Sequence, residues 1–126
     1  MAEIELKETH FLVSQTDEKG VITFANEDFS AVCGYSLEEL VGKPHNIVRH
    51  PDMPKAAFKQ LWDTIKSGKT WTGLVKNRAK SGDFYWVYAT IMVSKNHEGE
   101  TSYLSARKRA TPEEIAEAEA LYRTMV

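Results

Sequence analysis

Asn77 is the residue of this sequence whose type and expected position most directly suggest a ligand. The stretch 71–80 alternates, so that Trp71, Val75 and Asn77 share one face of a strand while the basic residues share the other. That apolar face should be buried, and a buried carboxamide needs hydrogen-bond partners to offset its desolvation. A loop or a water could supply them. A heteroaromatic ligand could supply them equally well, with Trp71 and Tyr85 as its aromatic walls.

A second group of polar residues precedes a predicted helix that begins near Pro54. Arg49, His50 and Asp52 lie there together. They could be a solvated loop in which Asp52 caps the helix, or a polar rim for a ligand that carries hydroxyl or phosphate groups. His45, His50 and Asp52 are also the residue types of a metal site, but their spacing comes from an irregular loop, so we do not expect a metal.

The sequence gives no support for catalysis. Cys33 stands between Val32 and Gly34 at the end of an apolar helical stretch, where a buried and inert thiol is expected. There is no Ser-His-Asp pattern and no pair of carboxylates placed for acid-base work. We therefore expect that the chain is not an enzyme.

The composition suits one globular domain that stays in the cytoplasm. The chain has 126 residues, of which 42% are hydrophobic and 27% are charged. Sixteen basic and eighteen acidic residues give a net charge of -2, so no overall charge favours nucleic acid. The single cysteine excludes an internal disulfide framework and suits a reducing compartment. No apolar run approaches the roughly 20 residues that span a bilayer, so we expect no membrane contact by this segment.

The elements that must position these residues are short strands and helices. Alternation and turn residues predict strands over 10–16, 21–24, 71–80, 85–94 and 101–107. Capping residues and apolar spacing predict helices over 27–33, from Ser36 to about Gly42, from about Pro54 to Ser67, and from Thr111 onward, with an irregular stretch over 43–53. This order favours an α+β fold, in which a five-stranded antiparallel sheet has short helices packed over one face and a C-terminal helix.

The strings that surround these residues resemble a known sensory family. Asn26 lies in FANEDFSAVCGYSLEEL, which resembles the signature of PAS domains. GKPHNIVRHPDMPKAAFKQLW and the later WTGLVKNRAKSGDFYWV resemble, more specifically, the FAD-binding PAS domain of bacterial aerotaxis receptors. The likeness runs from about Phe11 to Tyr122, which is nearly the whole chain. It implies an N-terminal segment (1–9), a PAS sensor domain (10–110) and a C-terminal helix (111–126) leading to a signalling region outside this chain.

The resemblance also implies a function and a set of ligand contacts. Members of this family bind FAD non-covalently between the sheet and the helices, and use its redox state to sense oxygen or respiratory electron flow. The carried-over FAD contacts are Asn26, Arg49, His50, Asp52, Trp71, Asn77 and Tyr85. The implied partners are FAD, a second copy of the chain and the downstream signalling domain of the same receptor, which would be anchored to the inner membrane.

Two other functions stay open on the sequence. In the first, the domain holds no cofactor and only dimerises, through Trp86, Tyr88 and the terminal helix. In the second, the domain is a sensor that binds haem through His45 or His50. In the FAD reading, a partner would contact the outer face of the sheet. That face is expected to carry Trp86, Tyr88, Lys76, Arg78 and Lys80.

Overall fold

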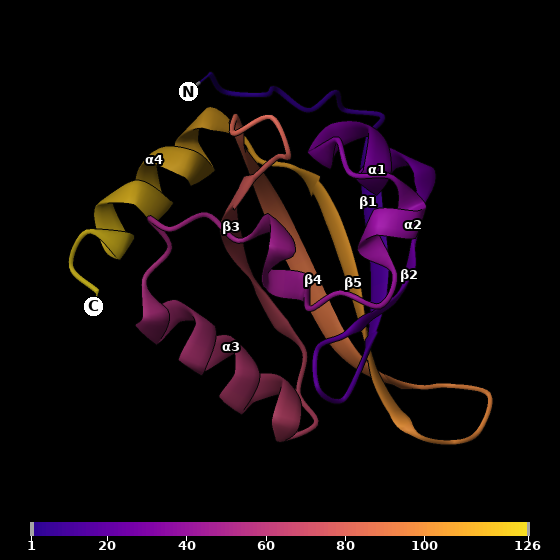
Figure 1. Ribbon diagram of the computed structural model, residues 1–126. Coiled ribbons are helices and arrows are strands. Elements are labelled where there is room, and N and C mark those ends of the chain that lie inside the picture. The colour runs from indigo at the N-terminus through magenta and orange to yellow at the C-terminus, as the bar shows by residue number, and fades with distance from the viewer. Residues whose placement is uncertain (1, 126) are drawn as a thin grey trace.

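The computed structural model describes residues 2–125 and contains one five-stranded sheet flanked by helices (Figure 1). The strands are β1 (Phe11–Asp17), β2 (Ile22–Ala25), β3 (Trp71–Arg78), β4 (Phe84–Lys95) and β5 (Thr101–Arg109). Their order across the sheet is β2-β1-β5-β4-β3, and every neighbouring pair is antiparallel. The predicted α+β fold with a five-stranded antiparallel sheet is confirmed. Met1 and Val126, the outermost residues of the predicted terminal segments, lie outside the described residues.

The helices begin where the sequence places their caps. They are α1 (Glu27–Cys33), α2 (Leu37–Leu40), α3 (Lys55–Lys66) and α4 (Pro112–Tyr122), with a short 3₁₀-helix η1 (His45–Val48). Ser36 and Thr111 each form the predicted capping box, in which the hydroxyl and a glutamate three residues later satisfy each other's backbone N–H groups. Gly34 ends α1 at a φ of 80°, which glycine adopts without strain. Within residues 2–125, no helix is both long enough and apolar enough to cross a bilayer.

Two details differ from the sequence prediction. The stretch 43–53 was expected to be irregular, but it contains η1, and α3 begins after it with Pro54 as its N-cap. The strand predicted to reach Lys80 ends at Arg78, because the chain turns through Gly82 and the backbone N–H of Lys80 donates to the carbonyl of Cys33 over 2.8 Å. Lys80 therefore does not belong to the outer face of the sheet.

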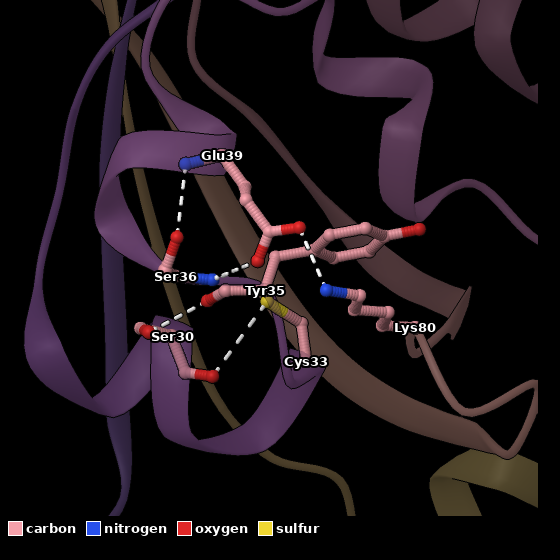
Figure 2. Close-up of polar contacts among 6 residues, drawn as sticks. All are labelled: Ser30, Cys33, Tyr35, Ser36, Glu39 and Lys80. Atoms are coloured by element: carbon pink, nitrogen blue, oxygen red, sulfur yellow. Dashed lines mark hydrogen bonds and ion pairs between the residues drawn. The ribbon is translucent and has the colours of Figure 1, made fainter.

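Lys80 instead joins the β3–β4 turn to α2. Its ammonium lies 2.7 Å from the carboxylate of Glu39, and Figure 2 shows this pair beside the capping bonds of Ser36. The hydrogen bond from Lys80 is the main reason why the pKa of Glu39 is lowered. The thiol of Cys33 is buried in the same region, as predicted, and burial raises its pKa. Together these contacts fix α1 and α2 against the end of the sheet.

The sheet packs apolar residues on both of its faces. The main core lies between the inner face and α1, α2 and α3, and the segment before β1 adds the buried Leu6. On the opposite face, Trp86 is buried with Ala118 of α4, and the rings of Trp86 and Tyr122 are stacked at 6.4 Å. The expectation that Trp86 would be available on an open outer face is therefore wrong, because α4 packs against it and leaves it buried. Tyr88 remains half-exposed on that face.

Candidate functional site

A cavity of about 220 Å³ lies between α3 and the inner face of the sheet. Its apolar wall consists of four α3 side chains at helical spacing: Phe58, Leu61, Trp62 and Ile65. Its floor is formed by inward-facing residues of β1, β3, β4 and β5, among them Thr16, Val75, Asn77, Ile91, Tyr103, Ser105 and Arg107. The β1–β2 turn and η1 with its flanking residues complete it. A cavity with an apolar wall and a few polar floor groups is typical of a small-molecule site.

The floor contains polar atoms that the protein leaves unpaired. Among the described residues, neither Nδ2 of Asn77 nor Oγ of Ser105 has a hydrogen-bond partner, although both are buried. Asn77 faces Tyr85 across the β3–β4 ladder, and the hydroxyl of Tyr85 is also buried without a partner. Burial raises the pKa of Tyr85, so its hydroxyl stays protonated. Unpaired buried polar groups cost free energy, so the two that line the cavity, Nδ2 of Asn77 and Oγ of Ser105, indicate a ligand that supplies the missing bonds.

Arg107 brings a buried positive charge to the cavity. It is 4% exposed, and its guanidinium donates to Oγ of Ser14 over 3.1 Å and to Nε2 of His45 over 2.7 Å. In the described part of the chain it forms no ion pair with a carboxylate. Burial lowers its pKa to about 10, so it is still charged at neutral pH. A buried cation without a counter-ion favours a ligand with negative charge or with exposed acceptors.

His45 lines the cavity as a neutral side chain. Burial and the adjacent charge of Arg107 lower its pKa from 6.5 to about 3. Its Nε2 atom accepts from Arg107 and lies 3.1 Å from Oγ of Ser14. This nitrogen is therefore already engaged within the protein.

The charged side chains that line the cavity are all positive among the described residues. They belong to Lys19, Arg49 and Arg107, and the lining among the described residues includes no aspartate or glutamate. The guanidinium of Arg49 lies 3.9 Å from the centre of the Phe58 ring, which holds it against α3. The cavity therefore offers cations to a ligand and nothing that would repel an anion.

Of the seven residues named from the sequence, Arg49 and Asn77 line the cavity. Their backbones form an isolated antiparallel bridge, which fixes the loop beside the edge strand β3. Trp71 on β3 and Tyr85 on β4 are buried but do not line the cavity. The Trp71 ring covers Gly73, where an added Cβ would lie only 2.6 Å from it.

Asn26 lies away from the cavity, and its amide is used by the backbone. Its Oδ1 accepts from the N–H groups of Phe29 at 3.0 Å and Val13 at 3.1 Å, and its Nδ2 donates to the carbonyl of Phe11 over 2.8 Å. Asn26 therefore caps α1 and ties it to β1.

His50 and Asp52 also lie outside the cavity lining, next to β3. Nδ1 of His50 accepts from the backbone N–H of Asp52 over 3.0 Å, so His50 is neutral in this arrangement. The Asp52 carboxylate is mostly exposed and lies 3.0 Å from the ammonium of Lys76, whose hydrogen bond lowers the Asp52 pKa. The chain turns after Arg49, so that Arg49 lines the cavity while His50 and Asp52 do not.

The sequence candidates for ligand contact did not include Lys19, Tyr103, Ser105 and Arg107, which line the cavity. The alternation of Tyr103, Ser105 and Arg107 on β5 was a usable signal, because residues two apart share a face. Lys19 had no such signal, since its place beside the cavity depends on how the β1–β2 turn packs. Within residues 2–125 no three histidine, cysteine, aspartate or glutamate side chains are grouped to hold a metal ion.

The comparisons with known proteins point to one family. The profile described as PAS fold matches residues 22–106. The aerotaxis receptor of Escherichia coli is 56% identical over 115 residues, which are 90% of this chain and 22% of the receptor. A nitrogen fixation regulatory protein of Klebsiella pneumoniae is 30% identical over 97 residues, covering 77% of this chain and 20% of that protein. The chain thus spans about a fifth of the length of these relatives.

Solved structures agree on the fold. The dark structure of the blue-light photoreceptor Aureochrome1 LOV superposes with a TM-score of 0.73 at 18% identity, covering 88% of this chain and 86% of the other. A light-oxygen-voltage domain studied with a flavin analogue gives a TM-score of 0.72 at 22% identity, with coverage of 90% and 84%. At these identities the likeness concerns the arrangement of the elements.

Proposed function

This chain belongs to the PAS fold family, and we propose that it is a sensory domain that binds FAD non-covalently and reports redox state or oxygen in aerotaxis-type signalling. The observation that carries the proposal is the cavity floor, where Asn77 and Ser105 present unpaired buried polar atoms beside the uncompensated charge of Arg107. A flavin ring system offers the donors and acceptors that these atoms lack. The 56% identity to an aerotaxis receptor supports the signalling context.

Each cavity residue has a distinct part in this proposal. Asn77 would hold the polar edge of the flavin ring, because its free Nδ2 donates and the amide can rotate to exchange donor for acceptor. Arg107 would stabilise negative charge on the ligand, since it is a fixed cation with no carboxylate partner among the described residues. The flavin, when bound, supplies the electron- and proton-accepting chemistry. Phe58 and Trp62 would exclude water from the α3 side.

Asn77 is our proposed first reporter of the redox state. A change of hydrogen-bond preference at the ligand would reorient the amide, and Asn77 pairs with both β4 and the backbone of Arg49. A shift of Asn77 would therefore act on the sheet and on the loop that covers the cavity. Among the other residues predicted from the sequence, Arg49 would contact the ligand directly. Trp71 and Tyr85 would support the strands that form the cavity floor. Asn26, His50 and Asp52 would act only indirectly.

The test is the absorption spectrum of the purified protein, followed by chromatography of the molecule released on denaturation. We expect a two-banded yellow spectrum and FAD in the released fraction. Asn77→Asp should weaken FAD retention, whereas Arg78→Gln, on the exposed side of the same strand, should retain FAD like the parent. An Asn77→Asp variant that binds flavin and signals normally would remove Asn77 from the mechanism.

The two alternatives predict different spectra. A haem sensor would show a Soret band, but the Nε2 atom of His45 is engaged by Arg107 and His50 lies outside the cavity lining, which disfavours both ligands. A cofactor-free dimerisation domain would stay colourless after incubation with FAD. The buried polar atoms of Asn77 and Ser105, which line the cavity and have no partner among the described residues, argue against that reading.

The remaining proposals concern domain organisation and partners. We propose that residues 10–110 are the sensor and that the helix from residue 111 onward leads to a signalling region; the similarity to an aerotaxis receptor, of which the match covers 22%, supports this proposal. The partners proposed are that region and a second copy of the chain, and the sensor would lie on the cytoplasmic side of the inner membrane. The relatives matched are named as receptors and regulators, and we propose that this domain likewise catalyses no reaction.

A further inference from the structure

Two cationic side chains that line the cavity come from segments that pack against α3. Arg49 follows η1, and its guanidinium packs on the ring of Phe58. Lys19 belongs to the β1–β2 turn, whose Gly20 is so close to Trp62 that an added Cβ would lie 3.2 Å from the ring. Phe58 and Trp62 are four residues apart on α3, which is about one helical turn or roughly 5.4 Å. The segments that carry the two cations thus meet α3 about one turn apart.

The turn that carries Lys19 is anchored to the loop that leads to Arg49. Oδ1 of Asp17 accepts from the backbone N–H groups of Lys19 at 2.9 Å and Val21 at 3.0 Å, which closes the turn. The N–H of His45 donates to the carbonyl of Gly20 over 2.9 Å and joins the turn to η1. The backbone positions of both cations are therefore fixed, while the flexible stem of Lys19 lets its ammonium adjust.

Neither cation is neutralised by the protein. In the part of the chain that the structure describes, Lys19 and Arg49 form no ion pair, unlike Lys59, Lys76 and Lys80, which each have a carboxylate partner. Asp17 is occupied by the backbone N–H groups of its own turn. Glu18, the direct neighbour of Lys19, is exposed, lies outside the cavity lining and forms no ion pair among the described residues. Two uncompensated cations beside a cavity without lining carboxylates indicate a site for an anion.

The volume of the cavity indicates which part of a ligand would contact these cations. A volume of about 220 Å³ is below the roughly 300–1,000 Å³ typical of sites that enclose a whole drug-sized ligand. A flavin dinucleotide would therefore leave its tail outside the enclosed space. We propose that Lys19 and Arg49 form a subsite for the diphosphate of that tail and so make the domain prefer phosphorylated flavins over riboflavin. This inference rests on the proposed flavin-binding function.

The experiment is a fluorescence titration of flavin-free protein with FAD, FMN and riboflavin, each at low and at high salt. For the parent chain we expect FAD to bind more tightly than riboflavin and only the phosphorylated flavins to lose affinity with salt. Lys19→Gln should weaken FAD binding about fivefold, as for a solvent-exposed ion pair, and leave riboflavin binding unchanged. Lys19→Arg should restore the affinity for FAD, because it restores the charge.

Lys43→Gln is the matched control, because Lys43 is exposed on the neighbouring loop and does not line the cavity. Equal affinity of the parent for FAD and riboflavin, or equal losses in Lys19→Gln and Lys43→Gln, would overturn the diphosphate subsite and leave flavin binding intact. If the parent binds none of the three flavins, the subsite and the proposed function both fail. Unchanged thermal unfolding of Lys19→Gln would show that any loss of affinity does not come from misfolding.

Discussion

The guanidinium of Arg107 donates to Nε2 of His45 over 2.7 Å, so a buried cation and a neutral imidazole share one hydrogen bond beside the cavity. Because arginine has only donors, Nε2 must be the acceptor, and the imidazole carries its proton elsewhere. A second proton on His45 would both break this bond and place two positive charges side by side. The stability of the fold and the charge of the cavity are therefore linked through one residue pair.

The first prediction concerns acid stability. The pKa of His45 is about 3 in the fold and 6.5 in the reference state, so below pH 6.5 the unfolded chain binds a proton that the folded chain does not. The neutral His45 therefore leaves the free energy of unfolding at its full value above about pH 6.5. This free energy decreases as the pH falls from 6.5 toward 3. We expect the free energy of unfolding to drop by about 2 kcal/mol between pH 7 and pH 5 from this residue. Urea denaturation at both values measures it.

A His45→Gln variant should flatten this pH dependence, because the glutamine oxygen accepts from Arg107 without titrating. The pKa of His50 is also lowered, mainly by burial, and adds a smaller effect of the same sign. His50→Gln therefore serves as the control and should retain most of the drop. A parent protein equally stable at pH 7 and pH 5 would show that His45 is not held neutral.

The second prediction concerns the charge at Arg107. If the domain binds a flavin, reduction adds negative charge to the cavity, and a buried cation favours the reduced form. Arg107→Gln should then lower the reduction potential by roughly 30 mV or more, since about 30 mV corresponds to 1.4 kcal/mol for a two-electron couple. Spectroelectrochemical titration measures the potential. Lys108→Gln is the control, because Lys108 is exposed on the opposite face, where its ammonium lies 5.5 Å from the Tyr88 ring. Equal potentials in the three proteins would contradict the assignment.

The sequence predicted the inward position of Asn77 in the cavity floor but not the β5 residues beside it. Alternation along 71–80 was sufficient to place Asn77 inward, because the period of a strand leaves little choice once Trp71 and Val75 are inside. The caps at Asn26, Ser36 and Thr111 were predictable for a similar reason, since each depends on residues within one turn. The structure confirms these local features.

The missing parts depend on contacts between distant segments. Arg107 ends a predicted strand and begins a basic run through Arg109, which reads as a solvated end until the ladder is seen to continue past it. The direction of His50 depends on how η1 turns the chain beside β3. Trp86 was correctly placed on the outer face, but nothing local says that α4 returns to cover it.

The third prediction concerns the close approach of Trp71 to Gly73. An added Cβ at Gly73 would lie 2.6 Å from the indole ring of Trp71, which is buried and so has little room to move. Gly73→Ala should therefore destabilise the fold by about 1–3 kcal/mol in urea denaturation. The double variant Trp71→Phe with Gly73→Ala should lose less than the two single changes added together, because the smaller ring relieves the overlap. Thr72→Ala, exposed on the same strand, is the control, and additive losses would contradict the contact.

The fourth prediction concerns how firmly α4 is held on the sheet. The hydroxyl of Tyr122 donates to the carbonyl of Leu74 over 2.5 Å, and its ring stacks on Trp86 at an interplanar angle of 17°. Ala118 is the buried residue of α4, and Met125, just beyond the helix, packs against the main core. Tyr122→Phe should cost about 1 kcal/mol through the lost hydrogen bond. Tyr122→Ala should in addition speed backbone hydrogen exchange across 112–122, since the stacking contact disappears as well.

Leu121→Ala provides the matched control, because Leu121 is the neighbouring α4 residue and is 58% exposed. Its exchange rates should match those of the parent except for the small change in helix propensity. If Tyr122→Ala leaves the exchange of 112–122 as slow as in the parent, then the Trp86–Tyr122 stack does not hold α4. In that case the helix would have to be retained by its N-terminal half, where Ile115 packs against the same small cluster.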